Sequence, residues 1–132
     1  MGDELDEREL FVHGPVVIFK WRNAAGWPVE YASANAVEVF GHGADDFVGG
    51  RVSYGEVLHP DDADRVGREV AAGTASGARG WAHAHYRVRH KDGSVRWMLA
   101  RGLAVRGADS VAYRIAGSQT DITDRRQAEA EL

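Results

Sequence analysis

A pair of histidines is the first feature of this chain with the means to do chemistry. His83 and His85 lie two positions apart, so on a β-strand both imidazoles would project from one face, as in some metal sites. A metal site needs further ligands, and no third one is visible from the sequence. We therefore favour the competing interpretation, a solvated or interface pair of histidines.

Four arginines form a basic stripe of the kind that binds anions or nucleic acids. They are Arg87, Arg89, Arg96 and Arg101. The whole chain, however, has 16 basic and 20 acidic residues and a net charge of −4, whereas nucleic-acid-binding proteins usually have a basic excess. We therefore expect these arginines to pair with acidic neighbours, and we expect no nucleic-acid partner.

The composition and the motifs exclude or disfavour several kinds of reaction. The chain has no cysteine, which excludes disulfides, thiolate metal sites, cysteine nucleophiles and cysteinyl–flavin adducts. Local spacing suggests no Ser/His/Asp arrangement, and Gly41-His42-Gly43 lacks the rest of a dinucleotide-binding fingerprint. Without a visible pair of nucleophile and base, a small ligand-cleaving enzyme is disfavoured, and we expect neither catalytic nor metal-ligating residues.

The elements that must position any site are predicted from local patterns. Strands are predicted where β-branched and aromatic residues gather, at 16–21, 29–33, 81–90, 95–105 and 111–120. Helices are predicted at 3–11, in short pieces at 36–40 and 44–48, from 60 to about 73, and from 121 onward. The central helix starts at His59-Pro60-Asp61-Asp62, where proline fits the first position and the aspartates complement the helix dipole.

The order of these elements indicates an α+β fold, because two strands come first, helices follow and three strands come last. Its 132 residues suit a single domain. The first hairpin must join the last three strands in one antiparallel sheet, so the central helices cover only one face. We expect the N-terminal helix or a second subunit to cover the other face.

The sequence contains no pattern typical of a membrane span or a signal peptide. Its longest apolar cluster, Val16-Val17-Ile18-Phe19, is far shorter than the roughly 20 residues of a membrane helix, and the N-terminus is acidic. We therefore expect a cytoplasmic location. The chain ends in helix-forming residues, so we expect a longer parent protein, which is free to carry a membrane anchor elsewhere.

Four motifs in this order make the chain resemble a PAS domain. They are Tyr31-Ala32-Ser33-Ala34-Asn35-Ala36 followed by Val39-Phe40-Gly41, then Leu58-His59-Pro60-Asp61-Asp62, then Tyr86-Arg87 through Lys91-Asp92-Gly93 to Arg96-Trp97, and finally Gly117 to Arg126. Each motif is weak alone, but four in the right order span nearly all of residues 15–126. The resemblance implies a five-stranded antiparallel sheet of order 2-1-5-4-3, with short helices and one longer helix over one face.

The resemblance also implies an organisation and a role. Residues 1–14 would be an N-terminal flanking helix, 15–121 the PAS domain and 122–132 the start of a C-terminal signalling helix. The role would be sensory: a small molecule or cofactor binds between sheet and helices. Asp121, Ile122 and Thr123 would then relay the signal to a covalently linked effector, a histidine kinase or a GGDEF-type diguanylate cyclase. We also expect a homodimer.

Strand alternation, together with the resemblance, selects the residues that would face the ligand pocket. They are Val17, Phe19, Trp21, Tyr86, Val88, Met98, Ala100, Ile115 and Gln119, with Ala84 on the same face.

The hairpin register decides the inward face of the fourth strand, which is apolar on both sides. A plain two-residue turn at Asp92-Gly93 would pair Val88 with Trp97. We follow the family's usual register instead, which turns Met98 inward. Trp97 and Leu99 would then face outward, beneath the N-terminal helix or a partner.

Gln119 bears most directly on the ligand, because a buried amide needs hydrogen-bond partners. In the flavin-binding photosensory branch of the family, a glutamine at this place contacts the flavin. The alternative, which we favour, is a glutamine bonded to backbone within the core. The reactive cysteine of that branch corresponds approximately to Val52, so thiol-adduct photochemistry is excluded while non-covalent flavin binding stays open. We do not expect haem, because the helix from Asp61 to Gly73 has no histidine.

Two functions from different classes remain. The first is a sensory module that binds a small molecule and relays a conformational change through its C-terminal helix. The second is a ligand-free PAS dimerisation or protein-interaction module, in which bulky side chains such as Phe19, Tyr86 and Met98 fill the pocket.

Overall fold

A computed structural model describes residues 15–75, 77–82, 85–109 and 112–131. Its strands are β1 (Val16–Arg22), β2 (Val29–Ala32), β3 (Gly80–Ala82), β4 (Tyr86–Arg89), β5 (Val95–Arg106) and β6 (Ala112–Asp121). Its helices are α2 (Ala36–Phe40), α3 (Ala44–Val48), α4 (Tyr54–Val57), α5 (Pro60–Thr74) and α6 (Thr123–Glu131). The helix predicted at 3–11 lies outside the described residues, and no helix within them is long and apolar enough to cross a membrane.

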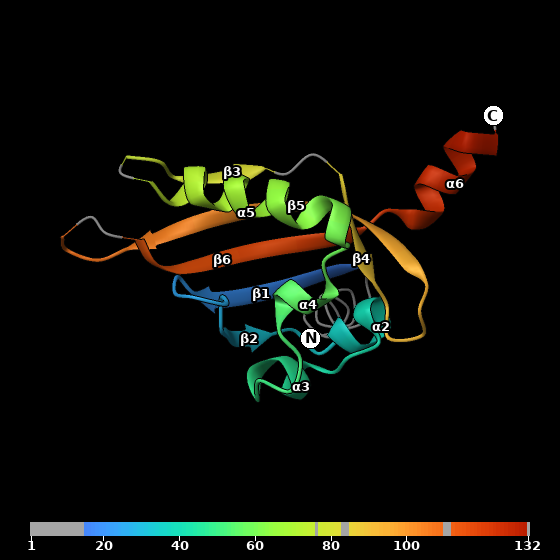
Figure 1. Cartoon of the computed structure of the whole chain (residues 1–132), viewed down its shortest axis with the longest axis horizontal. Coiled ribbons are helices and arrows are strands. Elements are labelled where there is room, and N and C mark those ends of the chain that lie inside the picture. The colour runs from blue at the N-terminus through green and yellow to red at the C-terminus, as the bar shows by residue number, and fades with distance from the viewer. Residues whose placement is uncertain (1–14, 76, 83–84, 110–111, 132) are drawn as a thin grey trace, which may run out of the picture.

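One antiparallel sheet of described strands runs in the order β2-β1-β6-β5-β3, with β4 also paired to β5 (Figure 1). β1 pairs with β6 along its whole length, from Val16 opposite Thr120 to Arg22 opposite Arg114. The predicted α+β fold and its order 2-1-5-4-3 are confirmed, with β3 and β4 together in the place of the third strand.

The prediction of a single strand over 81–90 is wrong. β3 places Ala82 opposite Arg101, whereas β4 places Tyr86 opposite Met98. Three residues therefore separate the two paired segments on one side, but only two separate their partners on β5. The two segments therefore pair with β5 in registers that differ by one residue, which a single regular ladder cannot accommodate.

The hairpin of β4 and β5 turns at Asp92-Gly93, where the glycine has a φ of 90° that other residues rarely adopt. Its ladder has Tyr86 opposite Met98 and Val88 opposite Arg96, which is not the register of a plain two-residue turn. Met98 is fully buried, so this register turns it inward as predicted.

α5 lies across one face of the sheet (Figure 1). It begins as predicted, with Pro60 in its first turn and the His59 ring accepting a hydrogen bond from the Asp61 N–H at 3.1 Å. Its start is clamped to β4, because the Arg87 guanidinium donates two 3.0 Å hydrogen bonds to the Asp62 carboxylate. The backbone N–H of Arg87 adds a third, at 2.8 Å. Arg87, donating these hydrogen bonds, lowers the pKa of Asp62.

The densest part of the core is an aromatic cluster around Phe19, which is fully buried. The Phe19 ring meets Phe40, Phe47 and Tyr54 edge to face, with centroids 5.5, 5.2 and 5.1 Å away, and stacks on Trp21 at 5.3 Å. Such edge-to-face pairs are a favourable arrangement of aromatic rings. The cluster therefore joins the centre of the sheet to α2, α3 and α4.

Candidate functional site

A core cavity of about 30 Å³ lies between the sheet and α5. Its walls come from β1, the β1–β2 turn, α4, α5, β3, β4 and β6. The lining residues are Trp21, Trp27, Tyr54, Val66, Val70, Trp81, Tyr86, Ile115 and Gln119. The sheet and the helices therefore meet around this cavity, as they do around the aromatic cluster beside it.

The residues predicted to face a ligand pocket divide into two groups. Trp21, Tyr86, Ile115 and Gln119 line the core cavity. Val17, Phe19, Val88, Met98 and Ala100 are buried but do not line it. Ala84 lies outside the described residues. All nine described residues are thus inward, while their role in holding a ligand stays a prediction.

Two buried polar atoms on residues that line the core cavity have no hydrogen-bond partner among the described residues: Trp21 Nε1, a donor, and Gln119 Oε1, an acceptor. Trp21 is 6% exposed and Gln119 is 4% exposed, so neither side chain is well placed to bond to bulk water. Buried polar atoms are nearly always paired. The interpretation of Gln119 as bonded within the core therefore fails for its carbonyl oxygen.

Tyr54 and Tyr86 supply the only hydroxyls among the described residues that line the cavity, and one donates a hydrogen bond to the other with an O···O distance of 2.6 Å. Burial raises the pKa of both phenols, so both are neutral at physiological pH. The pair holds α4 to β4 without adding a charge to the cavity.

Trp81, which sequence reasoning missed, stands in a slot made by two glycines. A Cβ atom at Gly73 of α5 or at Gly102 of β5 would overlap its indole. The indole is therefore held between helix and sheet. Nothing in the local sequence predicts the slot, because Gly73 and Gly102 meet only in the folded chain.

Trp27, also missed, occupies the β1–β2 turn in a strained backbone conformation. Its φ is 47°, a left-handed value that is unusual for a bulky residue and more so before a proline such as Pro28. Such conformations cost about 1–3 kcal/mol and cluster at ligand clamps and switches. The tip of the half-buried indole lies against α5, 3.7 Å from where a Cβ of Gly67 would stand.

Tyr54 was missed because the glycine-rich stretch around it predicts only irregular structure. One local signal was nevertheless present. Ser53 and Glu56 have the spacing of a capping box, and Ser53 Oγ accepts a hydrogen bond from the Glu56 N–H at 3.2 Å. This cap starts α4 and so places Tyr54 on the cavity wall.

At the exit from the sheet, Asp121 is the central acceptor. Its carboxylate accepts hydrogen bonds from the Thr123 N–H at 2.9 Å and from the Thr123 hydroxyl at 2.7 Å. Arg96 forms an ion pair with it at 2.7 Å. Two of the three predicted relay residues, Asp121 and Thr123, are therefore joined directly to each other and to β5.

Trp97 connects β5 to α6. Its N–H donates to Thr123 Oγ1 at 2.8 Å, and its carbonyl accepts from the Ile122 N–H at 2.9 Å. The Arg126 guanidinium stands over its indole, 3.8 Å from the ring centroid. We predicted that the N-terminal helix or a partner covers Trp97; among the described residues α6 contacts it, and the N-terminal helix lies outside them.

The basic stripe and the histidines are partly explained by these contacts. Arg87 and Arg96 pair with aspartates, as predicted for the stripe. His85 Nδ1 lies 3.0 Å from the Arg126 guanidinium, and His83 is outside the described residues. No cluster of three or more metal-ligating side chains occurs within the described part of the chain.

A flavin does not fit the core cavity in this structure. The cavity of about 30 Å³ is roughly a tenth of the smallest typical ligand pockets, which begin near 300 Å³. Val52, at the approximate position of the photosensory cysteine, packs against the core but does not line the cavity.

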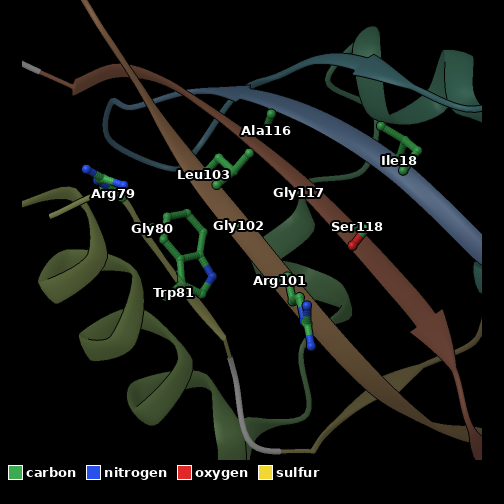
Figure 2. Close-up of a pocket in the computed structure, with 10 residues that line it drawn as sticks. All are labelled: Ile18, Arg79, Gly80, Trp81, Arg101, Gly102, Leu103, Ala116, Gly117 and Ser118. Carbon is green, nitrogen blue, oxygen red and sulfur yellow. The ribbon is translucent and has the colours of Figure 1, made fainter.

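The outer face of the sheet carries a shallow apolar groove of about 620 Å³ (Figure 2). Leu103 of β5 stands at its centre and is 64% exposed. Ile18, Ala116 and Ser118 line one side of the groove and Arg79 and Gly80 the other.

Comparison with known proteins identifies the family. A family model described as the PAS fold matches residues 29–119, and the chain belongs to this family. The PAS domain is a sensory, non-catalytic module of signal transduction. A methyl sulfide methyltransferase-associated sensor of Methanosarcina acetivorans is 37% identical over 129 residues, which is 98% of this chain but 13% of that protein.

Solved structures agree with this assignment. A sensory box histidine kinase/response regulator from Burkholderia thailandensis is similar with a TM-score of 0.71 and 27% identity, covering 94% of this chain and 90% of that one. The N-terminal domain of a diguanylate cyclase with a PAS/PAC sensor from Marinobacter aquaeolei has a TM-score of 0.68 and 20% identity, covering 84% and 98%. The latter likeness establishes the fold.

Proposed function

We propose that this chain is a sensory module that takes a small molecule into its core cavity and relays occupancy through α6 to a linked effector. The unpartnered donor of Trp21 and acceptor of Gln119 carry the proposal. A molecule that enters the cavity can bond each of these two atoms, so binding offsets the cost of burying them without a protein partner.

The relay that we propose runs along β6. Gln119 lies two residues before Asp121, and it pairs with Ala100 of β5 just as Asp121 pairs with Met98. A shift of β6 at the cavity would change the bonds of Asp121 to Arg96 and Thr123, and so bias the position of α6. This is a population shift between two geometries of one junction.

The effector and the location belong to the same proposal. Similar proteins are named as a sensor, as a histidine kinase/response regulator and as a diguanylate cyclase. We propose a cytoplasmic module whose α6 leads into an effector of the kinase or cyclase kind. In Figure 1, α6 projects away from the sheet, a suitable direction for such a connection.

Native mass spectrometry and hydrogen exchange test this function together. Protein purified from its host is expected to retain a small molecule that is lost on mild denaturation. Amides of α6 should differ in protection between the loaded and stripped forms. Thr123→Val, which keeps the shape but removes the hydroxyl between Asp121 and Trp97, should reduce that difference. Loaded and stripped forms with the same protection in α6 would contradict the relay.

A ligand-free dimerisation module is the second candidate, and the outer groove favours it. Leu103 protrudes within a shallow groove whose lining includes Gly80 and Gly117, which have no side chains, so the groove offers both a knob and space beside it. A two-fold axis would insert the Leu103 of each copy into the groove of the other. Leu103→Glu should convert dimer to monomer in light scattering, whereas Tyr31→Glu, also exposed but away from the groove, should not.

A further inference from the structure

The two unpartnered atoms specify what a ligand must offer. Trp21 Nε1–H requires an acceptor, and Gln119 Oε1 requires a donor. Both side chains are more than nine-tenths buried, so a group that bonds them must itself enter the cavity. A ligand with one acceptor and one donor satisfies both atoms, whereas a hydrocarbon satisfies neither.

The rest of the lining specifies charge and shape. None of the described residues that line the core cavity is acidic or basic, and the two tyrosine hydroxyls are hydrogen-bonded to each other. A charged ligand would lose its hydration without meeting a counter-charge. The indoles of Trp21 and Trp81 and the ring of Tyr86 instead offer aromatic faces and edges to a flat, neutral ring.

The size of the cavity shows that one wall must move before such a ring can enter. At about 30 Å³ the cavity has room for water but not for an aromatic ring. Trp81 is confined between Gly73 and Gly102. Trp27 differs, because it is half-buried, belongs to a turn and holds a strained left-handed φ of 47°.

We propose that the core cavity is a site for a small, neutral, planar heteroaromatic molecule with one hydrogen-bond acceptor and one donor, and that the Trp27 indole is a plug that leaves to admit it. The acceptor bonds Trp21 Nε1–H and the donor bonds Gln119 Oε1. The ligand ring takes the volume that the Trp27 indole vacates against α5. This inference rests on the proposed function, of which it names the ligand class.

The test uses benzimidazole, which has both a donor and an acceptor and is neutral above pH 7, and indene, which has the same shape and neither group. The chain has four tryptophans, so protein labelled with ¹⁵N-tryptophan gives four indole N–H resonances, assigned by single Trp→Phe substitutions. Both probes are titrated into wild type and into Trp27→Gly, where glycine accepts the positive φ and leaves the plug volume empty. Trp27→Ala is the second plug variant if the glycine loosens the turn.

The expected result is that Trp27→Gly binds benzimidazole at least tenfold more tightly than wild type does, and at least tenfold more tightly than it binds indene. The chemical shift of the Trp21 indole N–H should change on addition of benzimidazole and should not change on addition of indene. Gln119→Leu in the Trp27→Gly background should reduce the preference for benzimidazole about tenfold.

Equal affinity for both probes in the two plug variants would overturn the inference, and so would a Trp21 resonance that does not move. The proposed relay fails differently, because unchanged protection of α6 on saturation leaves the preference between the probes intact.

Discussion

The two ends of the core are built in opposite ways from the same kind of residue. Phe40, Phe47 and Tyr54 meet the Phe19 ring edge to face at 5.1–5.5 Å, and none of these three has an unpartnered polar atom among the described residues. Around the core cavity, the aromatic walls leave empty space, two unpartnered polar atoms and a strained tryptophan.

Under the proposed function, this difference separates the residues that stabilise the fold from those that bind the ligand. A closely packed cluster has little to gain from a ligand, because its contacts are already made. The cavity end gives up packing and hydrogen bonds that a second molecule can restore. Trp21 and Tyr54 belong to both ends, with rings 5.3 Å apart, so the two ends of the core are in direct contact.

We expect the largest effect from removing the Phe19 side chain, because the aromatic cluster packs around it. Phe19→Ala should lower the free energy of unfolding by about 3–5 kcal/mol, because its ring contacts four other aromatic rings in a fully buried position. Urea denaturation followed by circular dichroism measures the loss. Tyr31→Ala, at a residue 47% exposed, is the control and should change the value by less than about 0.5 kcal/mol. If both variants lost a similar free energy of unfolding, the cluster around Phe19 would not be a specially stabilising part of the core.

Gly102→Ala tests the slot at the cavity end and should cost less, about 1–3 kcal/mol. Its new methyl group would overlap the Trp81 indole, which must leave the slot. Tryptophan fluorescence should shift to longer wavelength as the indole becomes exposed. In a Trp81→Ala background the same substitution should be nearly neutral, so a double-mutant cycle measures the coupling. An unchanged cost in that background would contradict the slot.

Acid should weaken the clamp that holds the start of α5, one turn before Val66 reaches the cavity. Hydrogen bonds from Arg87 depress the folded-state pKa of Asp62, so its contribution is fully present above the unfolded pKa of about 4 and is lost as pH falls through the folded value. At pH 7 the free energy of unfolding of wild type should be about 1–2 kcal/mol higher than that of Asp62→Asn. The difference should shrink steadily below pH 4 in urea titrations. A constant difference would mean that the carboxylate charge does not matter.

Much of the fold follows from local pattern, because its causes are local. Pro60 after His59 predicts the start of α5, and alternation predicts the inward position of Trp21 on β1, whereas the family resemblance was needed to turn the face of Gln119 on β6 inward. The first two features depend on steric and hydrophobic rules that act over a few residues. The register that turns Met98 inward came from the family resemblance, since both faces of β5 are apolar.

The walls of the cavity were harder to predict, because they depend on contacts between distant segments. The place of Trp81 requires Gly73 and Gly102 to face each other. That of Trp27 requires a strained turn that its residue types argue against. The prediction of a satisfied Gln119 failed for its carbonyl oxygen for a related reason: its neighbours are set by the whole core, whereas alternation shows only which residues share its face.

The smallest expected effect is a gain in stability, and it comes from a substitution at the cavity end of the core. Gln119→Leu replaces the unpartnered oxygen with an apolar group of similar volume, so it should raise the free energy of unfolding by about 1 kcal/mol. Gln119→Met, longer and more flexible, should also stabilise, which distinguishes removal of the oxygen from a better fit of leucine. Both variants should bind benzimidazole less well than wild type. A residue whose removal stabilises the fold and impairs binding is maintained for the ligand. If both variants destabilise the protein, the oxygen has a partner that the unliganded core supplies, and the two ends of the core differ less than their packing indicates.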